Sequence, residues 1–179
     1  MLWTADPLFV WIAAACTSTL LAHAAIVKLA DLDLWRQHLA AYGMPANAQR
    51  LAAAVVPGAE AIAGVLLLTP WRIYGAVLAA SLLLLYAVAM ASLRLQGRTP
   101  DCGCGGEPLP VSWALVGRNV VLAALAVLAS APMAERALGG ADYLVVVAAV
   151  VLAGLIYAAF HQVLRHRAAP RATTALWRT

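Results

Sequence analysis

The sequence predicts an all-α, polytopic membrane protein: a four-helix transmembrane bundle plus a fifth, C-terminal transmembrane helix. Of the 179 residues, 64% are hydrophobic and 11% are charged, and the mean hydropathy is +0.85. A soluble domain carries roughly 45–50% apolar and about 25% charged residues. The apolar excess is spread over several runs, each close to the about 20 residues that a helix needs to cross a bilayer. The formal charge of +4 then reflects basic membrane loops and predicts no nucleic-acid partner.

The first predicted span covers residues 7–29, contains His23 and ends at Lys28. In residues 30–50, apolar side chains interleave with charged ones. That pattern is typical of an amphipathic helix lying in the membrane interface. The Gly and Pro of residues 41–45 should end this helix, because both residue types favour turns.

The second predicted span covers residues 51–69 and carries Glu60 inside an apolar run. Pro57 should interrupt it, because proline removes a backbone hydrogen bond from a helix. Ser112 is suited to cap the fourth span, since a serine side chain can accept a hydrogen bond from the first turn. The remaining predicted spans are 73–93, 113–131 and 143–160.

The predicted spans divide the chain into three parts. Residues 1–131 form the four-helix core, and residues 94–112 within it form a polar loop that carries a pair of cysteines. Residues 132–164 add the fifth helix. Residues 165–179 form a basic tail.

Lysine and arginine are strongly segregated by the predicted spans. Of the 12 basic residues, ten fall on one side of the membrane, and only Arg72 and Arg136 fall on the other. Cytoplasmic loops carry the excess of Lys and Arg. We therefore expect a multi-pass plasma-membrane protein with the N-terminus outside, and with the C-terminus and the cysteine loop on the cytoplasmic side. The ten residues are Lys28, Arg36, Arg50, Arg94, Arg98, Arg118, Arg165, Arg167, Arg171 and Arg178.

The cysteine pair, Cys102 and Cys104, is the strongest candidate for chemistry. A disulfide across one intervening residue departs from relaxed geometry, and strain makes such a bond easier to reduce. Gly103 allows the backbone torsions that the small ring needs. We predict thiol–disulfide exchange, in which one thiolate attacks a partner disulfide and the other resolves the mixed disulfide. Arg118 is a candidate thiolate stabiliser, because nearby positive charge favours the thiolate.

Two other interpretations of the pair remain open. Cys102 and Cys104 could bind a thiophilic metal, with Glu60 and His23 lining a path for it. The loop could also be a turn without chemistry in a scaffold of a membrane complex. The sequence predicts no cofactor, and nothing in it supports a quinone, so the chain is a candidate thiol–disulfide oxidoreductase without an assigned substrate.

An ionisable residue within a span is costly and marks a site or a buried pair. At ~1.5 Å per helical residue, Glu60 lies about 13 Å and His23 about 9 Å from the basic side. Lys28 sits at the boundary, and its long stem can bend inward. We therefore expect Glu60 to contact His23 or Lys28, either as a polar contact that packs two helices or as part of a proton relay.

Two further polar positions have less defined roles. Arg118 and Asn119 lie about one turn into the fourth span, where Arg118 either reaches the interface or turns back over the cysteine loop.

Cys16 lies roughly 20 Å from the cytoplasmic end of its helix, out of reach of the other two cysteines. A small buried thiol in a helix usually serves packing.

Five short motifs occur in order along the chain and together carry a family resemblance. They are Lys28-Leu29, Ala-Tyr-Gly-x-Pro at 41–45, Pro-Gly-x-Glu at 57–60, Asp-Cys-Gly-Cys-Gly at 101–105, and Ser112-Trp113 followed by Arg118-Asn119. The series resembles the MauE branch of the DoxX-like membrane proteins over residues 8–131. Gly105 departs from it, because the family usually has an aromatic residue there.

The resemblance implies a four-helix core in the bacterial cell membrane and a role in methylamine utilisation or a related pathway. It implies support for disulfide formation in the light subunit of methylamine dehydrogenase, together with a thioredoxin-like partner or a client protein. Cys102 and Cys104 match the redox pair of the family. Maturation of an exported enzyme would place this pair outside, whereas the charge count places it inside. The other matching positions are Lys28, Glu60, Arg118 and Asn119.

Overall fold

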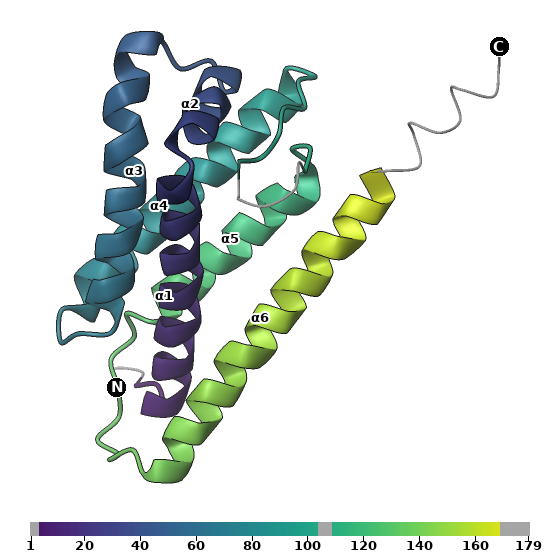
Figure 1. Ribbon diagram of the computed structural model, residues 1–179. Coiled ribbons are helices and arrows are strands. Elements are labelled where there is room, and N and C mark those ends of the chain that lie inside the picture. Colours follow the sequence, from purple (N-terminus) through teal and green to yellow (C-terminus); the bar gives the residue numbers. More distant parts are fainter. Residues whose placement is uncertain (1–3, 104–108, 169–179) are drawn as a thin grey trace.

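The computed structural model describes residues 4–103 and 109–168, and this part of the chain forms six α-helices (Figure 1). Within it, α1, α3, α4 and α6 are long and apolar enough to cross a membrane, and α5 is a shorter apolar helix. The prediction of an all-helical polytopic membrane protein is confirmed. The helices are α1 (Pro7–Ala30), α2 (Leu32–Ala41), α3 (Ala46–Leu67), α4 (Arg72–Leu95), α5 (Trp113–Leu128) and α6 (Gly140–Ala168).

The amphipathic segment forms α2, as expected, but the second span differs from the prediction. Helix α3 begins at Ala46 and runs without a break through Pro57. The expected interruption at Pro57 is wrong. Proline removes one backbone donor, but the Pro57 ring is fully buried, and contacts with neighbouring helices can compensate for a freed carbonyl inside a membrane.

The last two helices also differ from their predicted bounds. Helix α5 ends at Leu128, and Ser112 occupies its N-cap position without a side-chain hydrogen bond. Helix α6 continues to Ala168, well past the expected end near Phe160. Phe160 and Leu164 both pack against a buried cluster next to the cysteine loop, so the extra helical turns bury apolar surface that the hydropathy pattern alone does not show.

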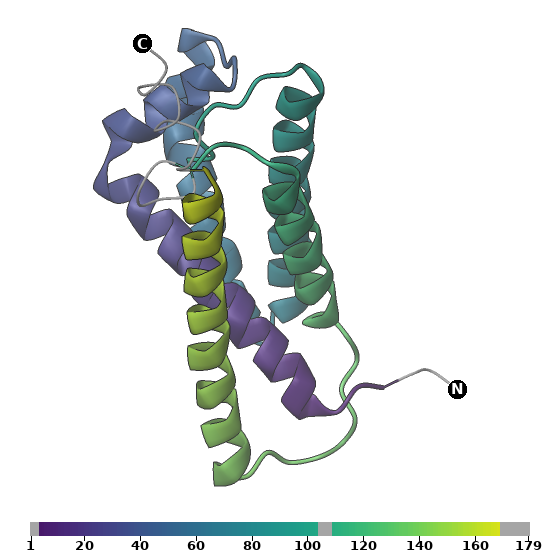
Figure 2. The same ribbon diagram turned by 90° about the vertical axis from the view of Figure 1, so that its right-hand side faces the viewer.

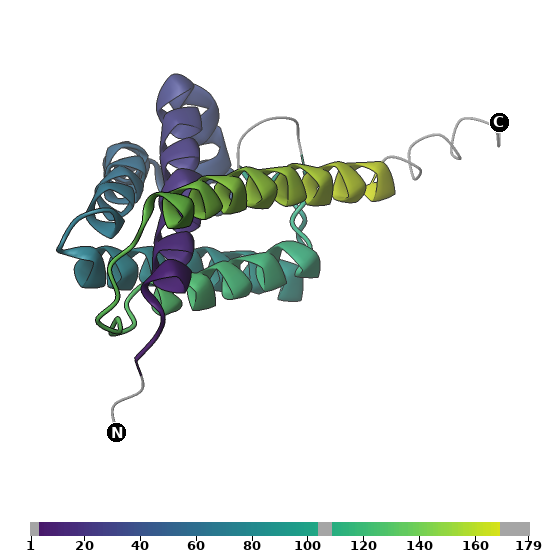
Figure 3. The ribbon, with the colours of Figure 1, turned by 90° about the horizontal axis from the view of Figure 1, so that it is seen from below.

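Helix α1 is the centre of the bundle and packs against each of the other helices. Helices α4 and α5 lie side by side, and α6 stands apart from them along α1 (Figures 2 and 3). Ser18 of α1 donates a hydrogen bond to the Gly64 carbonyl of α3 at 2.7 Å. Small residues let membrane helices approach closely, and the buried centre is rich in alanine: Ala13, Ala14, Ala63, Ala76, Ala79, Ala123 and Ala126.

The two ends of the bundle carry different segments (Figure 1). One end holds α2, the described parts of the loop between α4 and α5, and the C-terminal turns of α6. We call it the cysteine-loop end. The opposite end holds the start of α1, the turn between α3 and α4, and the connection between α5 and α6.

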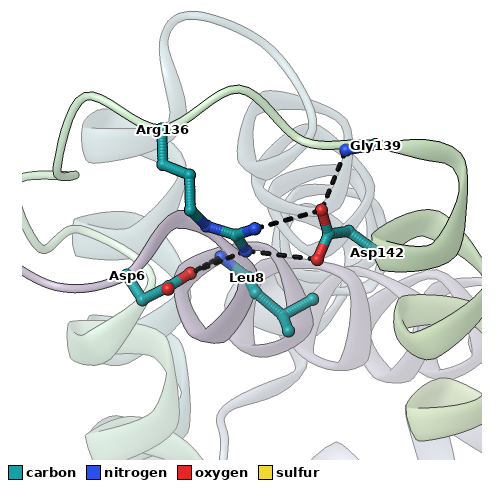
Figure 4. Close-up of polar contacts among 5 residues, drawn as sticks. All are labelled: Asp6, Leu8, Arg136, Gly139 and Asp142. Atoms are coloured by element: carbon teal, nitrogen blue, oxygen red, sulfur yellow. Dashed lines mark hydrogen bonds and ion pairs between the residues drawn. The ribbon is translucent and has the colours of Figure 1, made fainter.

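At the opposite end, Arg136 ties the start of α1 to the start of α6 (Figure 4). Its guanidinium donates to Asp6 Oδ1 at 3.0 Å and to both carboxylate oxygens of Asp142 at 3.2 Å. Asp6 also accepts a hydrogen bond from Leu8 N at 2.8 Å, and Asp142 accepts one from Gly139 N at 2.8 Å. The hydrogen bonds from Leu8 and Arg136 lower the pKa of Asp6 below its usual value.

Helices α3 and α4 meet so closely at Gly75 that a side chain does not fit. A Cβ at Gly75 would lie 2.6 Å from Leu67 N and 2.9 Å from the Leu66 carbonyl carbon, both backbone atoms. We expect Gly75→Ala to destabilise the fold by about 1–3 kcal/mol through overpacking. Gly58→Ala is the control, because a Cβ there meets nothing within 4 Å. Alanine is favoured over glycine in a helix by roughly 0.5–1 kcal/mol.

Thermal unfolding of the two variants in detergent, followed by circular dichroism, checks this prediction. The unfolding temperature should fall for Gly75→Ala and stay level or rise for Gly58→Ala. Equal shifts in both variants would show that the close approach at Gly75 is unimportant for stability.

Candidate functional site

A cavity of about 520 Å³ at the cysteine-loop end gathers most of the site residues predicted from the sequence. All six helices contribute to its lining. Its volume lies within the roughly 300–1,000 Å³ typical of small-molecule sites. Cys104 lies outside the described residues, and Cys16 is not part of the lining. The predicted residues that line the cavity are His23, Lys28, Glu60, Cys102, Arg118 and Asn119.

A buried ion pair lies in the wall of this cavity. Lys28 Nζ of α1 contacts Glu60 Oε1 of α3, and the two residues are 7% and 0% exposed. Tyr86 of α4 donates its hydroxyl to the same Glu60 oxygen at 2.8 Å. The Lys28 ammonium lies 5.2 Å from the ring centroids of Tyr86 and Trp35, a distance that allows cation–π attraction. The expected contact between Glu60 and Lys28 is confirmed, and it joins three helices.

Some residues of the wall carry a buried polar atom whose hydrogen bond is not made. Within the described part of the chain, neither Glu60 Oε2 nor Trp35 Nε1 has a hydrogen-bond partner. Leaving a buried polar group unsatisfied costs about 1–3 kcal/mol. Both atoms are covered by neighbouring protein atoms, so they lie behind the surface of the cavity.

The described part of the cysteine loop is held by hydrogen bonds within the loop. Cys102 N donates to the Leu109 carbonyl at 2.9 Å. Asp101 Oδ1 accepts hydrogen bonds from Gly103 N at 3.3 Å and from Leu109 N at 3.1 Å. Cys102 is 8% exposed and packs in a cluster with Leu109 and Leu115. These contacts fix the backbone position of Cys102 against the bundle.

Helix α2 covers this loop and is attached to it by three contacts. Tyr42 donates its hydroxyl to the Cys102 carbonyl at 3.3 Å. His38 Nε2 lies 3.5 Å from Asp101 Oδ2, and Arg98 donates to a backbone carbonyl at the end of α2 at 2.8 Å. The sequence-based prediction did not include His38 or Tyr42 as site residues. Their amphipathic helix was recognisable, but no pattern pairs it with a loop 60 residues further along the chain.

Gly103 fits the loop for two reasons. Its φ of +65° is in the left-handed region, which side-chain-bearing residues adopt only with strain. A Cβ at this position would also lie 3.0 Å from two atoms of the His38 ring. The glycine between the cysteines is therefore required both by the backbone torsion and by the helix packed over it.

Arg118 connects α5 to α6 in the wall of the cavity. Its Nη1 donates to the Tyr157 hydroxyl at 3.1 Å and lies 2.7 Å from His161 Nε2. Its guanidinium carbon lies 5.5 Å from the centroid of the Tyr157 ring. Asn119 is 2% exposed, and its amide donates to Met90 Sδ at 3.7 Å. Arg118 thus faces the cavity that Cys102 lines, and its action on a thiolate stays a prediction.

The described residues do not provide a set of metal ligands that would support a soft-metal site. Across residues 4–103 and 109–168, no group of three His, Cys, Asp or Glu side chains is arranged to hold a metal ion. A closed zinc site takes four ligands. A metal at Cys102 would therefore depend on ligands from outside these residues.

Comparison with known proteins identifies the family. The family model described as "Methylamine utilisation protein MauE" matches residues 6–132, which contain α1 to α5. The chain belongs to the MauE family. This confirms the resemblance carried by the five sequence motifs, while the wider DoxX-like grouping stays a prediction. Helix α6, and with it Tyr157 and His161, lies outside the matched residues of this family member.

Two curated relatives support the MauE assignment. The chain is 40% identical over 132 residues to the methylamine utilization protein MauE of Paracoccus denitrificans, covering 68% of each chain. It is 35% identical over 140 residues to the methylamine utilization protein MauE of Paracoccus versutus, covering 75% of each. No solved structure matches the chain.

The packing of His38 over Gly103 can be tested with a matched glycine. Gly97 has a similar φ of +72°, but a Cβ there meets nothing within 4 Å. Alanine should cost about 1–2 kcal/mol at either position because of the left-handed backbone. Gly103→Ala should lose more stability than Gly97→Ala, because it also displaces His38. The unfolding temperature of each variant in detergent measures the difference.

A second substitution separates the backbone strain from the clash. Adding His38→Ala to Gly103→Ala should recover part of the lost stability, whereas adding it to Gly97→Ala should recover none. If Gly97→Ala is as destabilising as Gly103→Ala, the packing of His38 on the loop is not significant.

Proposed function

We propose that this MauE-family chain is a membrane thiol–disulfide redox protein of methylamine utilisation, with Cys102 and Cys104 as its working pair. The observation that carries the proposal is the position of Cys102. It is buried and fixed at a cavity that also contains Lys28, Glu60 and Arg118. The names of the two Paracoccus relatives support the pathway. The client is the light subunit of methylamine dehydrogenase or an analogous protein, reached through a thioredoxin-like partner.

The burial of Cys102 supports different roles for the two thiols. At 8% exposure, Cys102 offers little surface to a folded partner, and we propose that the partner's thiolate attacks Cys104 Sγ. The Cys102–Cys104 bond breaks, a mixed disulfide forms on Cys104, and Cys102 leaves as a thiolate. A second partner thiolate then releases Cys104, which leaves the partner oxidised by two electrons and the pair reduced. The guanidinium of Arg118 brings positive charge to the cavity and favours the Cys102 thiolate.

The distribution of charge supports an orientation for the proposed exchange. At the opposite end, the described basic residues are Arg72 and Arg136. Exposed Trp71 and Tyr74 lie at that end too, as is typical of aromatic side chains at a membrane interface. Because basic residues are retained on the cytoplasmic side, we propose that the cysteine-loop end is cytoplasmic. Its described basic residues are Lys28, Arg36, Arg50, Arg94, Arg98, Arg118, Arg165 and Arg167.

Serine substitutions test the redox pair. Cys102→Ser and Cys104→Ser should both abolish disulfide exchange with a thioredoxin-like protein, and Cys16→Ser should retain it. The Cys102→Ser variant keeps the Cys104 thiol, the proposed site of attack, so it should accumulate a mixed disulfide on a non-reducing gel, whereas Cys104→Ser should not. Full exchange by both loop variants would overturn the proposed function.

Labelling with a membrane-impermeant thiol reagent tests the orientation. In a chain whose three native cysteines are serine, Thr99→Cys reports on the cysteine-loop end and Glu135→Cys on the opposite end; both positions are exposed. We expect Glu135→Cys to label in intact cells and Thr99→Cys to label only after the cells are opened. The reverse pattern would place the cysteine-loop end outside.

A further inference from the structure

A second pocket, of about 620 Å³, lies between α2 and the first turns of α3 at the cysteine-loop end. No residue lines both this pocket and the cavity described above. Its lining contains two arginines and no carboxylate, so the pocket is positively charged. The lining residues are Arg36, Ala46, Asn47, Gln49 and Arg50.

The two arginines present their charge at the surface of the protein. The Arg36 side chain is 46% exposed, and Arg50 is also exposed. Arg36 Nη1 donates to Asp33 Oδ1 at 3.0 Å, but an exposed ion pair of this kind contributes little, and the other N–H groups of the guanidinium remain available. Arg50 forms no ion pair with any described residue. Both guanidiniums are therefore accessible to an anion.

The start of α3 adds backbone donors to the pocket. Pro45 occupies the N-cap position, and no side chain caps the helix there. Ala46 and Asn47 belong to the first turn, whose N–H groups have no acceptor within the helix. A helix N-terminus attracts anions, and phosphate in particular, while a guanidinium can bind phosphate through two hydrogen bonds. The donors of this pocket therefore suit a phosphate group.

An exposed apolar stripe leads away from the pocket along α3. Helix α3 has 22 residues and is apolar enough to cross a membrane. At ~1.5 Å per residue its length is close to the about 30 Å of a bilayer core, so its first turn lies near the lipid headgroups. Leu51 and Val55 are 69% and 54% exposed. They follow Asn47 at intervals of four residues, so all three share one face of the helix.

We propose that this pocket binds the phosphate of an anionic phospholipid, whose acyl chains lie along Leu51 and Val55. Basic pockets between membrane helices suit anionic headgroups. A zwitterionic headgroup would bring its own positive charge close to Arg36 and Arg50, so the anionic lipid is favoured. The phosphate connects α2 to the start of α3. This binding does not depend on the proposed thiol exchange.

Titration of the purified full chain in detergent with phosphatidylglycerol tests the site. Arg36→Gln and Arg50→Gln should each weaken binding roughly fivefold, as expected for one basic residue at a headgroup. Arg167→Gln is the matched control, because Arg167 is exposed at the same end of the bundle but does not line the pocket. It should bind like the unmodified chain. Circular dichroism shows whether each variant is folded, and either arginine variant is decisive alone because the two lie on different helices.

Two further ligands identify which part of the lipid is recognised. Phosphatidylethanolamine with the same acyl chains should bind at least about fivefold more weakly than phosphatidylglycerol, because its headgroup carries no net charge. Glycerol 3-phosphate has the phosphate but no acyl chains, and should bind at least about tenfold more weakly because it buries no apolar surface.

Three results would overturn the proposal. Equal binding of phosphatidylglycerol by the unmodified chain and by both arginine variants would show that the pocket is not the site. Equal affinity for the two lipids would exclude recognition of the negative charge. Glycerol 3-phosphate binding as tightly as the lipid would identify the occupant as a soluble anion.

Discussion

The buried ion pair between Lys28 and Glu60 is the contact on which the rest of the site depends. Two charges removed from water lose several kcal/mol of hydration each, so such a pair persists only with good geometry and further hydrogen bonds. Glu60 receives one from Tyr86, and Lys28 lies over the rings of Tyr86 and Trp35. Through these contacts the pair connects α1, α3 and α4, and brings α2 against them.

The pair also links the interior of the membrane to the cysteine loop. Trp35 of α2 packs over Lys28. His38 of the same helix contacts Asp101, and Tyr42 at the end of the helix contacts the Cys102 carbonyl, so both residues hold the loop. A shift of α2 would therefore change both the ion-pair environment and the position of Cys102. This arrangement explains why the short amphipathic helix α2 matters to a site built mainly from the long apolar helices.

Much of this architecture could be predicted from the sequence, because depth in a membrane follows directly from helical rise. Counting residues from the basic side brought Glu60 and Lys28 within reach of each other, and the structure shows their contact. The continuous helix through Pro57 and the packing of α2 on the loop were not predictable. Both depend on packing between segments distant in sequence, which hydrophobic periodicity does not record.

A double-mutant cycle on Lys28 and Glu60 tests the central claim most directly. The free energy of unfolding in mixed micelles would be measured for Lys28→Met, Glu60→Gln and the double variant. Each single change should cost about 3–5 kcal/mol, because it leaves the other charge buried and unpaired. The double variant should lose clearly less than the sum, with a coupling of about 2 kcal/mol or more. Additive losses would show that the two side chains act independently and would contradict this account.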